Sequence, residues 1–249
     1  MSPVDSFGRS QTVLVLGGNS DLGQAIARRM VDDGARTVIL AGRDPERPTD
    51  PPIDADTDHR YFDAADTASH DKFFNEVFSD HPNIDAVVIA FGVLHSQGSV
   101  DQRPELAVEM AQVNYVGAAS ALLHSERRLR ERGGGQLVVL SSLAGLQPRP
   151  SNFSYGSTKA GIDFLARGLA RTSQRGNVHV LVVRPGFVHT AMTADLPSRP
   201  FAVGPEDVAD AVVEALSRRA GVVFVPAILK WVMWVLRLLP YPIVARLDR

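Results

Sequence analysis

A tyrosine and a lysine four residues apart, Tyr155 and Lys159, are the residues whose types and spacing best suit acid–base chemistry. On one helix the two side chains share a face, with their Cβ atoms about 5–6 Å apart. A free tyrosine has a pKa of about 10, and a neighbouring ammonium lowers it by favouring the phenolate. A tyrosine tuned in this way can protonate a carbonyl oxygen or deprotonate an alcohol. The same spacing is common on surface helices, so the prediction depends on the surrounding elements.

A glycine-containing turn offers a second chemistry, phosphate binding. The segment Gly17-Gly18-Asn19-Ser20-Asp21-Leu22-Gly23 joins an apolar run to a helical pattern. Glycines let the backbone approach a pyrophosphate, and the following helix N-terminus presents free N–H groups to it. The spacing is not G-x-G-x-x-G, and a tight turn can need glycine for structural reasons alone. Its place after the first expected strand favours the binding interpretation.

The end of the second expected strand reads Ala41-Gly42-Arg43-Asp44. An acid at this place holds the adenosine ribose hydroxyls of NADH, whereas an arginine can hold the 2′-phosphate of NADPH. Arg43 followed by Asp44 is compatible with either cofactor. We expect a weak preference of the protein for NADPH.

The elements that must position these residues alternate between apolar runs and helical stretches. Strands are expected at Thr12–Leu16, Thr37–Leu40, Tyr61–Phe62, Ala86–Ala90, Gln136–Leu140, Val178–Val183 and Val222–Val225. Helices are expected at Asp21–Asp33, Ala68–Phe78, Arg103–Glu131, Tyr155–Gln174 and Pro205–Arg218, and residues 44–58, rich in Pro and Asp, as a surface loop. Continuous apolar strands between helices indicate a parallel sheet covered on both faces. The sequence predicts an α/β fold with a doubly wound, mostly parallel seven-stranded Rossmann sheet in a single domain.

The bulk composition excludes several classes of function. The chain has 249 residues, enough for one large domain, and a net charge of −2, which gives no basic field for nucleic acid. Without cysteine it has no disulfides, thiolate metal sites or cysteine nucleophile. Its seven histidines lack paired metal-ligand spacing, so no metal is expected. Residues 1–11 lack the basic and apolar regions of a secretion signal, and a cytoplasmic protein is the expectation.

With the glycine turn, Ser141-Ser142 at a strand end and Tyr155-x-x-x-Lys159, the chain resembles the short-chain dehydrogenase/reductase family over nearly its whole length. The resemblance implies an oxidoreductase that uses NADH or NADPH to act on C=O and CH–OH groups. It also suggests a homo-oligomer formed through the long helices.

This sequence departs from the family pattern at two places. The family's G-x-x-x-G-x-G turn maps onto Gly17, Asp21 and Gly23, so Asp21 replaces the middle glycine. The family's Asn-Asn-Ala-Gly strand end maps onto Ile89-Ala90-Phe91-Gly92, which keeps only the last glycine. The second departure is expected to weaken strand-end hydrogen bonding while leaving room for the cofactor.

The resemblance implies four catalytic residues. Ser142, thirteen residues before the tyrosine, donates a hydrogen bond to the substrate oxygen, and Tyr155 delivers the proton. Lys159 keeps the phenol acidic and binds the nicotinamide ribose, and Asn114 holds a water that links the lysine to solvent. Blander interpretations remain open for three of them: a strand-end cap for Ser142, a packed residue with a locally satisfied amide for Asn114, and a core aromatic for Tyr155.

The resemblance also implies a set of cofactor-binding residues. Asp63 matches the acid that binds adenine, and the Val188 backbone and the Thr190 hydroxyl match groups that bind the nicotinamide amide and a nearby phosphate. The full expected set is Gly17, Asn19, Ser20, Asp21, Leu22, Gly23, Arg43, Asp63, Ala90, Gly92, Tyr155, Lys159, Pro185, Gly186, Val188 and Thr190.

A narrower resemblance rests on the glycine turn, Ala90-Phe91-Gly92, residues 152–161 and 184–192, and a tail with tryptophans and Leu-Leu-Pro. Together they are similar to the decaprenylphosphoryl-2-keto-ribose reductases of mycobacteria. That group makes decaprenylphosphoryl arabinose, a precursor of cell-wall arabinan, and the likeness implies a lipid-linked keto-sugar substrate and a flavin oxidase partner. Arg149 and Arg199 could bind the lipid phosphate or be plain solvated arginines.

The tail, residues 227–249 after a domain of residues 1–226, contains the apolar run Ala227–Leu239. This run has 13 residues, and a membrane span needs about 20, so no transmembrane helix is expected there. A helix with two tryptophans and few charges can lie in a membrane interface. It can equally pack in a subunit interface or on the domain core. We expect peripheral membrane contact.

Three functions remain to be separated. The first is a reductase of a lipid-linked keto-sugar, and the second is a reductase or dehydrogenase of another apolar carbonyl or alcohol, such as a steroid or acyl thioester. The third is a dinucleotide-binding scaffold without turnover, which has no need for the combination of Ser142, Tyr155 and Lys159.

Overall fold

The computed structural model describes residues 10–173, 177–197 and 199–238. Seven parallel strands form one sheet in the order β3-β2-β1-β4-β5-β6-β7. The strands are β1 (Thr12–Leu16), β2 (Thr37–Gly42), β3 (Asp56–Tyr61), β4 (Ala86–Ile89), β5 (Gly135–Leu140), β6 (Val178–Pro185) and β7 (Val222–Val225). The predicted doubly wound α/β fold is confirmed.

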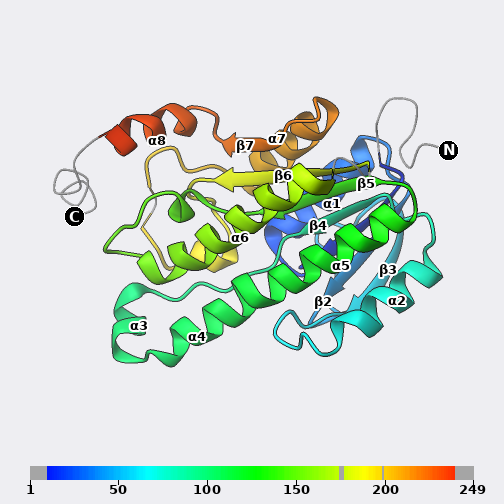
Figure 1. The fold of residues 1–249 in the computed structure, drawn as a ribbon, viewed down its shortest axis with the longest axis horizontal. Helices are drawn as coiled ribbons and strands as arrows, with labels where there is room; N and C mark the ends of the chain where they lie inside the picture. The colour runs from blue at the N-terminus through cyan, green and yellow to red at the C-terminus, as the bar shows by residue number, and fades with distance from the viewer. Residues whose placement is uncertain (1–9, 174–176, 198, 239–249) are drawn as a thin grey trace.

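Helices cover both faces of this sheet, as Figure 1 shows. The α-helices are α1 (Asp21–Asp32), α2 (His70–Asp80), α3 (Gln97–Gln102), α4 (Glu105–Ala111), α5 (Ala118–Glu131), α6 (Phe153–Ser173), α7 (Pro205–Ser217) and α8 (Leu229–Leu238). Helices α1 and α7 pack on one face, and α2, α5 and α6 pack on the other.

Alternate residues of each central strand supply two separate cores. In β1, Val13 and Val15 point to the core shared with α1 and α7, whereas Leu14 and Leu16 point to the core shared with α2, α5 and α6. All four side chains are fully buried. This explains why the strands read as continuous apolar runs, because side chains of a strand alternate between faces and both faces are covered.

The strand order reverses at β1, which lies between β2 and β4. Since all strands are parallel, their carboxyl ends meet at one edge of the sheet. In open α/β sheets ligands bind at this edge, beside the point where the order reverses. The fold therefore directs the turn after β1 and the ends of β2, β4, β5 and β6 towards one cleft.

The predicted strand at Tyr61–Phe62 is wrong in its bounds. Strand β3 runs from Asp56 to Tyr61, inside part of the expected loop, and pairs in parallel with β2. It lies at the sheet edge, and Tyr61 is 62% exposed. An edge strand with one covered side needs few apolar residues. The polar sequence of β3 therefore lacks the apolar pattern from which the other strands were predicted.

The expected helix Arg103–Glu131 contains α4, a π-helical turn from Gln112 to Gly117, and α5, and it is preceded by the unpredicted short helix α3. Within the described residues, Glu105–Glu131 is also the one helical stretch long and apolar enough to cross a membrane. Its residues Ala121, Leu122 and Leu129 are fully buried in the sheet-side core. Its inner face thus packs on the sheet, and the stretch meets the criteria for a membrane span by length and composition only.

Helix α8 packs on the domain through one face only. Leu229 and Met233 are buried against Leu143, with Leu146 and Phe224 packed around them. This small apolar cluster lies directly after the end of β5, at the carboxyl edge of the sheet. The remaining expected tail residues, from position 239 onwards, lie outside the described residues.

Candidate active site

The first turns of helix α6 carry Tyr155 and Lys159, facing the end of β5. A hydrogen bond joins the Tyr155 hydroxyl to that of Ser142, the second residue after β5. The Tyr155 ring packs against a small apolar cluster from α3 and α4, formed by Val100, Leu106 and Met110. Three elements therefore fix the position of the phenol and place it beside the serine.

Lys159 lies behind the tyrosine, and its side chain is buried. Its ammonium nitrogen is 5.8 Å from the centre of the Tyr155 ring and donates a hydrogen bond to the Leu140 carbonyl oxygen at 3.0 Å. Among the described residues this is the one hydrogen bond from Nζ, although an ammonium has three donors. A buried ammonium with unused donors suits a site that receives a polar ligand.

The electrostatics of the pair differ from the sequence expectation. Burial raises the pKa of Tyr155 to about 12, and the hydrogen bond from Ser142 opposes this rise. Burial lowers the pKa of Lys159 to about 8. The phenol is half-buried and so retains some solvation. In the protein alone Tyr155 thus holds its proton more tightly than free tyrosine, and the predicted lowering of its pKa is not seen.

Asn114 lies in the π-helical turn and is buried, with its amide hydrogen-bonded locally. Its Oδ1 accepts from the Val93 N–H at 2.8 Å, and its Nδ2 donates to the Val93 carbonyl at 2.8 Å and to the Thr158 hydroxyl at 3.3 Å. A Cβ atom on Gly92 would stand 3.1 Å from Asn114 Oδ1 and 3.7 Å from Lys159 Nζ. Asn114 therefore clamps the chain after β4 beside the lysine.

The turn between β1 and α1 folds tightly against the end of β4. Gly17 has φ +96°, and a Cβ atom there would lie 2.7 Å from the Ala90 carbonyl carbon. Ser20 caps α1 by accepting from the Gly23 N–H at 3.0 Å, and its hydroxyl contacts the Ala90 carbonyl at 3.0 Å. A Cβ atom on Gly23 would lie 2.4 Å from the Gly17 oxygen. Leu22 lies in the first turn of α1. The N-terminus of a helix is where backbone N–H groups bind anions.

Asn19 connects this turn to the end of β2. Its Nδ2 donates to the Asp44 carbonyl at 2.7 Å, and its Oδ1 accepts from the Asp44 N–H at 3.2 Å. Arg43 directly follows Gly42, the last residue of β2, and its side chain is exposed. Asp63 follows the neighbouring strand β3, and its Oδ1 accepts from the Ala65 N–H at 2.9 Å. Arg43 and Asp63 are thus at the same sheet edge, as expected.

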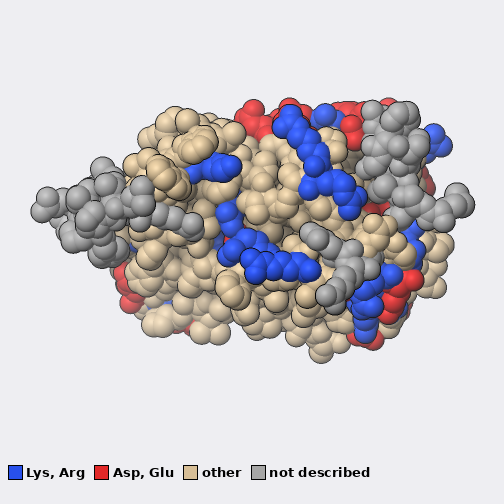
Figure 2. Space-filling view, turned by 45° about the horizontal axis from the view of Figure 1, so that its top comes forward, with Lys and Arg blue, Asp and Glu red and all other residues tan. Residues whose placement is uncertain are grey.

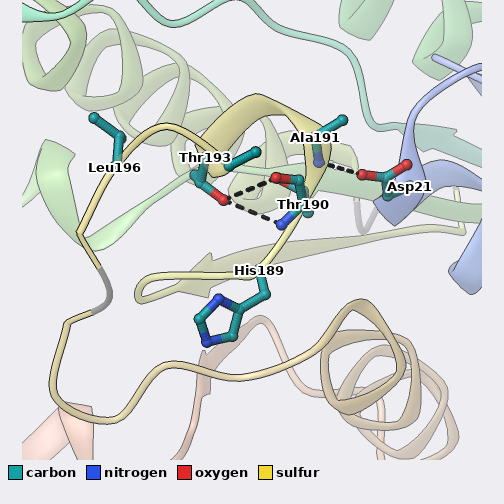
Figure 3. A pocket seen from close by; sticks show the side chains of 7 residues that line it. Asp21, His189, Thr190, Ala191, Thr193 and Leu196 are labelled. Carbon is teal, nitrogen blue, oxygen red and sulfur yellow. Dashed lines mark hydrogen bonds between the residues drawn. The ribbon is translucent and has the colours of Figure 1, made fainter.

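The segment after β6 forms the other side of the cleft. Gly186 bonds back to the Val225 carbonyl at 2.8 Å, and Val188 bridges to Val203. A cavity of about 430 Å³ lies between this segment and α1, lined by Asp21, His189, Thr190, Ala191, Thr193, Ala194 and Leu196. Figure 3 shows the Thr190 side chain here, in contact with Thr193. The structure brings Asp21 and Thr190 together, whereas in the sequence they are far apart.

One group at the site was missed in the sequence. The buried carboxylate of Asp163, one turn after Lys159 on α6, accepts hydrogen bonds from Arg184, Arg167 and Ser141. Arg167 and Arg184 hold the pKa of this carboxyl below its usual value, against the effect of burial. The signal available was an aspartate four residues after Lys159, on the same face of the expected helix.

The apolar cluster around α8 was also missed as part of the site. Leu143 directly follows Ser142, and a Cβ atom on Gly186 would lie 2.6 Å from the Leu229 side chain. Helix α8 therefore touches both the serine turn and the segment after β6. Nothing in its composition indicated which face packs inwards.

Comparisons with known proteins agree with this geometry. A family model described as short chain dehydrogenase matches residues 11–200. An uncharacterized oxidoreductase of Streptomyces coelicolor is 40% identical over 251 residues, covering 98% of this chain and 99% of that protein. An uncharacterized oxidoreductase of Mycobacterium tuberculosis is 37% identical over 243 residues, covering 95% and 97%.

Among solved structures, a short chain dehydrogenase of Burkholderia cenocepacia in complex with NADP is similar with a TM-score of 0.80. The match covers 93% of this chain and 94% of that one, at 22% sequence identity. At this identity the likeness supports the fold.

Proposed function

The chain belongs to the short-chain dehydrogenase/reductase family and is an oxidoreductase, and from this premise we propose that it reduces a carbonyl group with NADH or NADPH. The observation that carries the proposal is the hydrogen bond between Ser142 and Tyr155, with the buried Lys159 ammonium behind the ring. These three groups lie at the carboxyl edge of the sheet, the edge at which the glycine turn after β1 also lies.

The residues of the cleft fit a dinucleotide. A side chain at Gly17 or Gly23 would clash with neighbouring backbone. The absence of side chains there leaves the N-terminus of α1 accessible to a pyrophosphate. The unused donors of Lys159 suit the hydroxyls of the nicotinamide ribose. Val188 and Thr190 border the cleft opposite, and Arg43 and Asp63 flank the adenine end. A bound dinucleotide would supply the hydride that adds to the carbonyl carbon.

Proton delivery follows from the pKa shifts. Because burial raises the pKa of Tyr155 to about 12, the phenol enters the reaction protonated, as a reductase requires. Ser142 donates a hydrogen bond to the carbonyl oxygen as negative charge grows there. After Tyr155 gives up its proton, Lys159 stabilises the phenolate, because its pKa of about 8 keeps it mostly charged at neutral pH.

For the substrate, we propose the 2-keto group of a decaprenylphosphoryl 2-keto-pentose, reduced to give decaprenylphosphoryl arabinose for cell-wall arabinan. The resemblance in the glycine turn, residues 152–161 and the tail supports this choice. Exposed apolar residues beside the cleft, Met192, Leu196 and Phe201, suit a lipid chain. Arg149 and Arg199 have no ion-pair partner in the described part of the chain and remain available to the phosphate.

The test is a coupled assay with the full chain. The keto-sugar is generated in place by the flavin oxidase of the same pathway, and oxidation of NADPH or NADH is followed by absorbance. We expect turnover with the wild-type enzyme and none with the Tyr155→Phe variant. If the keto-sugar is inert while a steroid ketone or an acyl thioester is reduced, the second candidate replaces the first. The same exposed apolar residues favour that second candidate.

We also propose that the enzyme is cytoplasmic and contacts the membrane peripherally through α8. Ile228, Trp231, Trp234 and Val235 are each at least 48% exposed, on the face opposite the buried Leu229. Figure 2 shows basic side chains spread over a largely uncharged face, with acidic side chains mostly at its rim. On α8 itself, Lys230 Nζ lies 5.7 Å from the centre of the Trp231 ring. A tryptophan beside a basic group suits the interface of an anionic bilayer.

Co-sedimentation with anionic liposomes tests the membrane contact. Removing α8 would also uncover Leu143, so the better variant is Trp231→Ser with Trp234→Ser in the full chain. The control is Val108→Ser with Phe164→Ser, which removes two exposed apolar residues elsewhere. We expect only the tryptophan variant to lose binding. Equal binding by wild type and both variants would reject the contact, and a loss of oligomeric state in the tryptophan variant would assign the face to a subunit interface.

A further inference from the structure

Asp21 occupies a position where the family turn has glycine, and its side chain makes a hydrogen bond to a distant segment. It is the first residue of α1, directly after the capping Ser20. Its Oδ2 accepts a hydrogen bond from the Ala191 N–H at 2.6 Å, across 170 residues of sequence. Figure 3 shows this bond as a dashed line between Asp21, at the start of α1, and Ala191, in the segment after β6.

The segment that Asp21 holds is internally braced. Ala191 opens a 3₁₀ turn from Ala191 to Thr193, in which the Thr193 hydroxyl accepts from the Thr190 N–H at 3.1 Å. The Thr193 N–H donates to the Thr190 carbonyl at 3.0 Å. At its other end, the His189 N–H donates to the Val203 carbonyl at 3.0 Å. Because hydrogen bonds between Thr190 and Thr193 hold the turn together, a bond to Ala191 restrains the whole of residues 190–193.

This arrangement spans the place where the phosphates of a dinucleotide would lie. Asp21 is the lining residue that α1 contributes to the cavity of about 430 Å³, and residues 189–196 contribute the rest. The bond therefore connects the two sides of the cleft. A carboxylate here also places a negative charge near the anion-binding end of α1, where it opposes a pyrophosphate.

We propose that Asp21 is a latch residue that slows dinucleotide release by holding residues 190–193 across the phosphate turn. The inference rests on the proposed function, since it concerns the same cofactor. It separates two effects of one carboxylate: the oxygen acceptor holds the segment, and the charge weakens pyrophosphate binding. Asp21→Asn keeps an acceptor and removes the charge, whereas Asp21→Ala removes both.

The experiment measures dinucleotide dissociation by stopped-flow fluorescence on the full chain, for wild type, both variants and a control. The control is Asp207→Ala at the N-terminus of α7, where Asp207 accepts from the Gly204 N–H at 2.8 Å but does not line the cavity. Because both Asp21 variants remove the charge, loss of the hydrogen bond predicts a dissociation rate about tenfold faster for Asp21→Ala than for Asp21→Asn. Asp21→Asn and Asp207→Ala are expected to release the dinucleotide no faster than about threefold the wild-type rate.

A second readout needs no cofactor. Met192 and Leu196 are 44% and 39% exposed, and thermolysin cleaves before such residues. Asp21→Ala should be cut there faster than wild type or the control, because the segment has lost one of its anchors. A release rate for Asp21→Ala within about twofold of the Asp21→Asn rate, together with a cleavage rate within about twofold of wild type, would overturn the latch. If the folded wild type binds neither NADPH nor NADH, the proposed function itself fails.

Discussion

Asp163 and Arg184 form a two-point ion pair, with Arg184 Nε 2.8 Å from Oδ2 and its terminal nitrogen 2.9 Å from Oδ1. The same carboxylate accepts from Ser141 at 3.2 Å and from Arg167 at 2.7 Å. Ser141 precedes the proposed catalytic serine, and Asp163 follows Lys159 by one turn. The pair therefore ties together the ends of β5 and β6 and the helix that carries the tyrosine.

We predict that Asp163→Asn lowers the free energy of unfolding by about 3–5 kcal/mol, because it leaves buried guanidinium charge without its partner. Urea denaturation measures this. Asp210→Asn is the control, since it breaks the exposed pair with Arg29 and should cost less than about 1 kcal/mol. Equal losses in the two variants would contradict a structural role for the buried pair.

Tyr155→Phe should reduce turnover to less than about a tenth of wild type, because it removes the proton donor and leaves the ring packing against the apolar cluster from α3 and α4. Dinucleotide affinity should stay nearly unchanged, as measured by fluorescence titration. Activity retained above that level would reject Tyr155 as the acid.

Reduction should slow as the pH rises above about 8, because burial lowers the pKa of Lys159 to that value and the neutral amine no longer stabilises the phenolate. Tyr155, with a pKa of about 12, stays protonated through this range and does not cause the fall. The measurement is the pH profile of kcat between pH 6 and pH 10, roughly two units either side of the Lys159 pKa. Lys159→Met should lose the fall, and a wild-type profile flat across this range would argue against the assignment.

Arg43 should favour NADPH over NADH. It is exposed at the end of β2, where an arginine can bind a 2′-phosphate, so Arg43→Ala should weaken NADPH binding about tenfold and leave NADH binding unchanged. Affinities for both dinucleotides by calorimetry test this. A strong NADH preference in wild type would refute it.

Asp85, at the opposite end of the sheet, should make stability pH-dependent. Burial raises its pKa to about 6, although its carboxylate accepts from the N–H groups of Gln11 and Thr12. The folded chain then binds a proton that the unfolded chain has released, so the free energy of unfolding falls as the pH rises from about 4 to about 6. Urea denaturation across this range should show the slope in wild type. Asp85→Asn should lack that slope.

Much of the fold could be predicted from the sequence, because strands that are covered on both faces are continuously apolar and stand out from the helices between them. The bounds of β1 and β7 were predicted correctly, and the long helices were predicted to within a few residues. Polar β3 was misplaced, and the π-helical turn around Asn114 was not foreseen, because neither depends on hydrophobic periodicity. Within that turn, Asn114 bonds to Val93, which lies 21 residues earlier in the chain.

At the site, spacing in the sequence pointed to Tyr155 and Lys159, and the family resemblance pointed to Ser142. The structure brings these three side chains together. The sequence could not indicate the direction of the Tyr155 pKa shift, because burial depends on α3 and α4 packing over the ring. Nor could it reveal the bond between Asp21 and Ala191. Such contacts join segments far apart in sequence, and only the folded chain brings them within range.

The packing of α8 on Leu143 links the end of the described chain to the proposed catalytic serine. Leu143 directly follows Ser142, and its apolar neighbours Leu229 and Met233 belong to α8. A substitution on the inner face of α8 therefore changes the packing of the residue next to the serine, although the two segments are more than eighty positions apart, as the numbering of Ser142 and Leu229 shows.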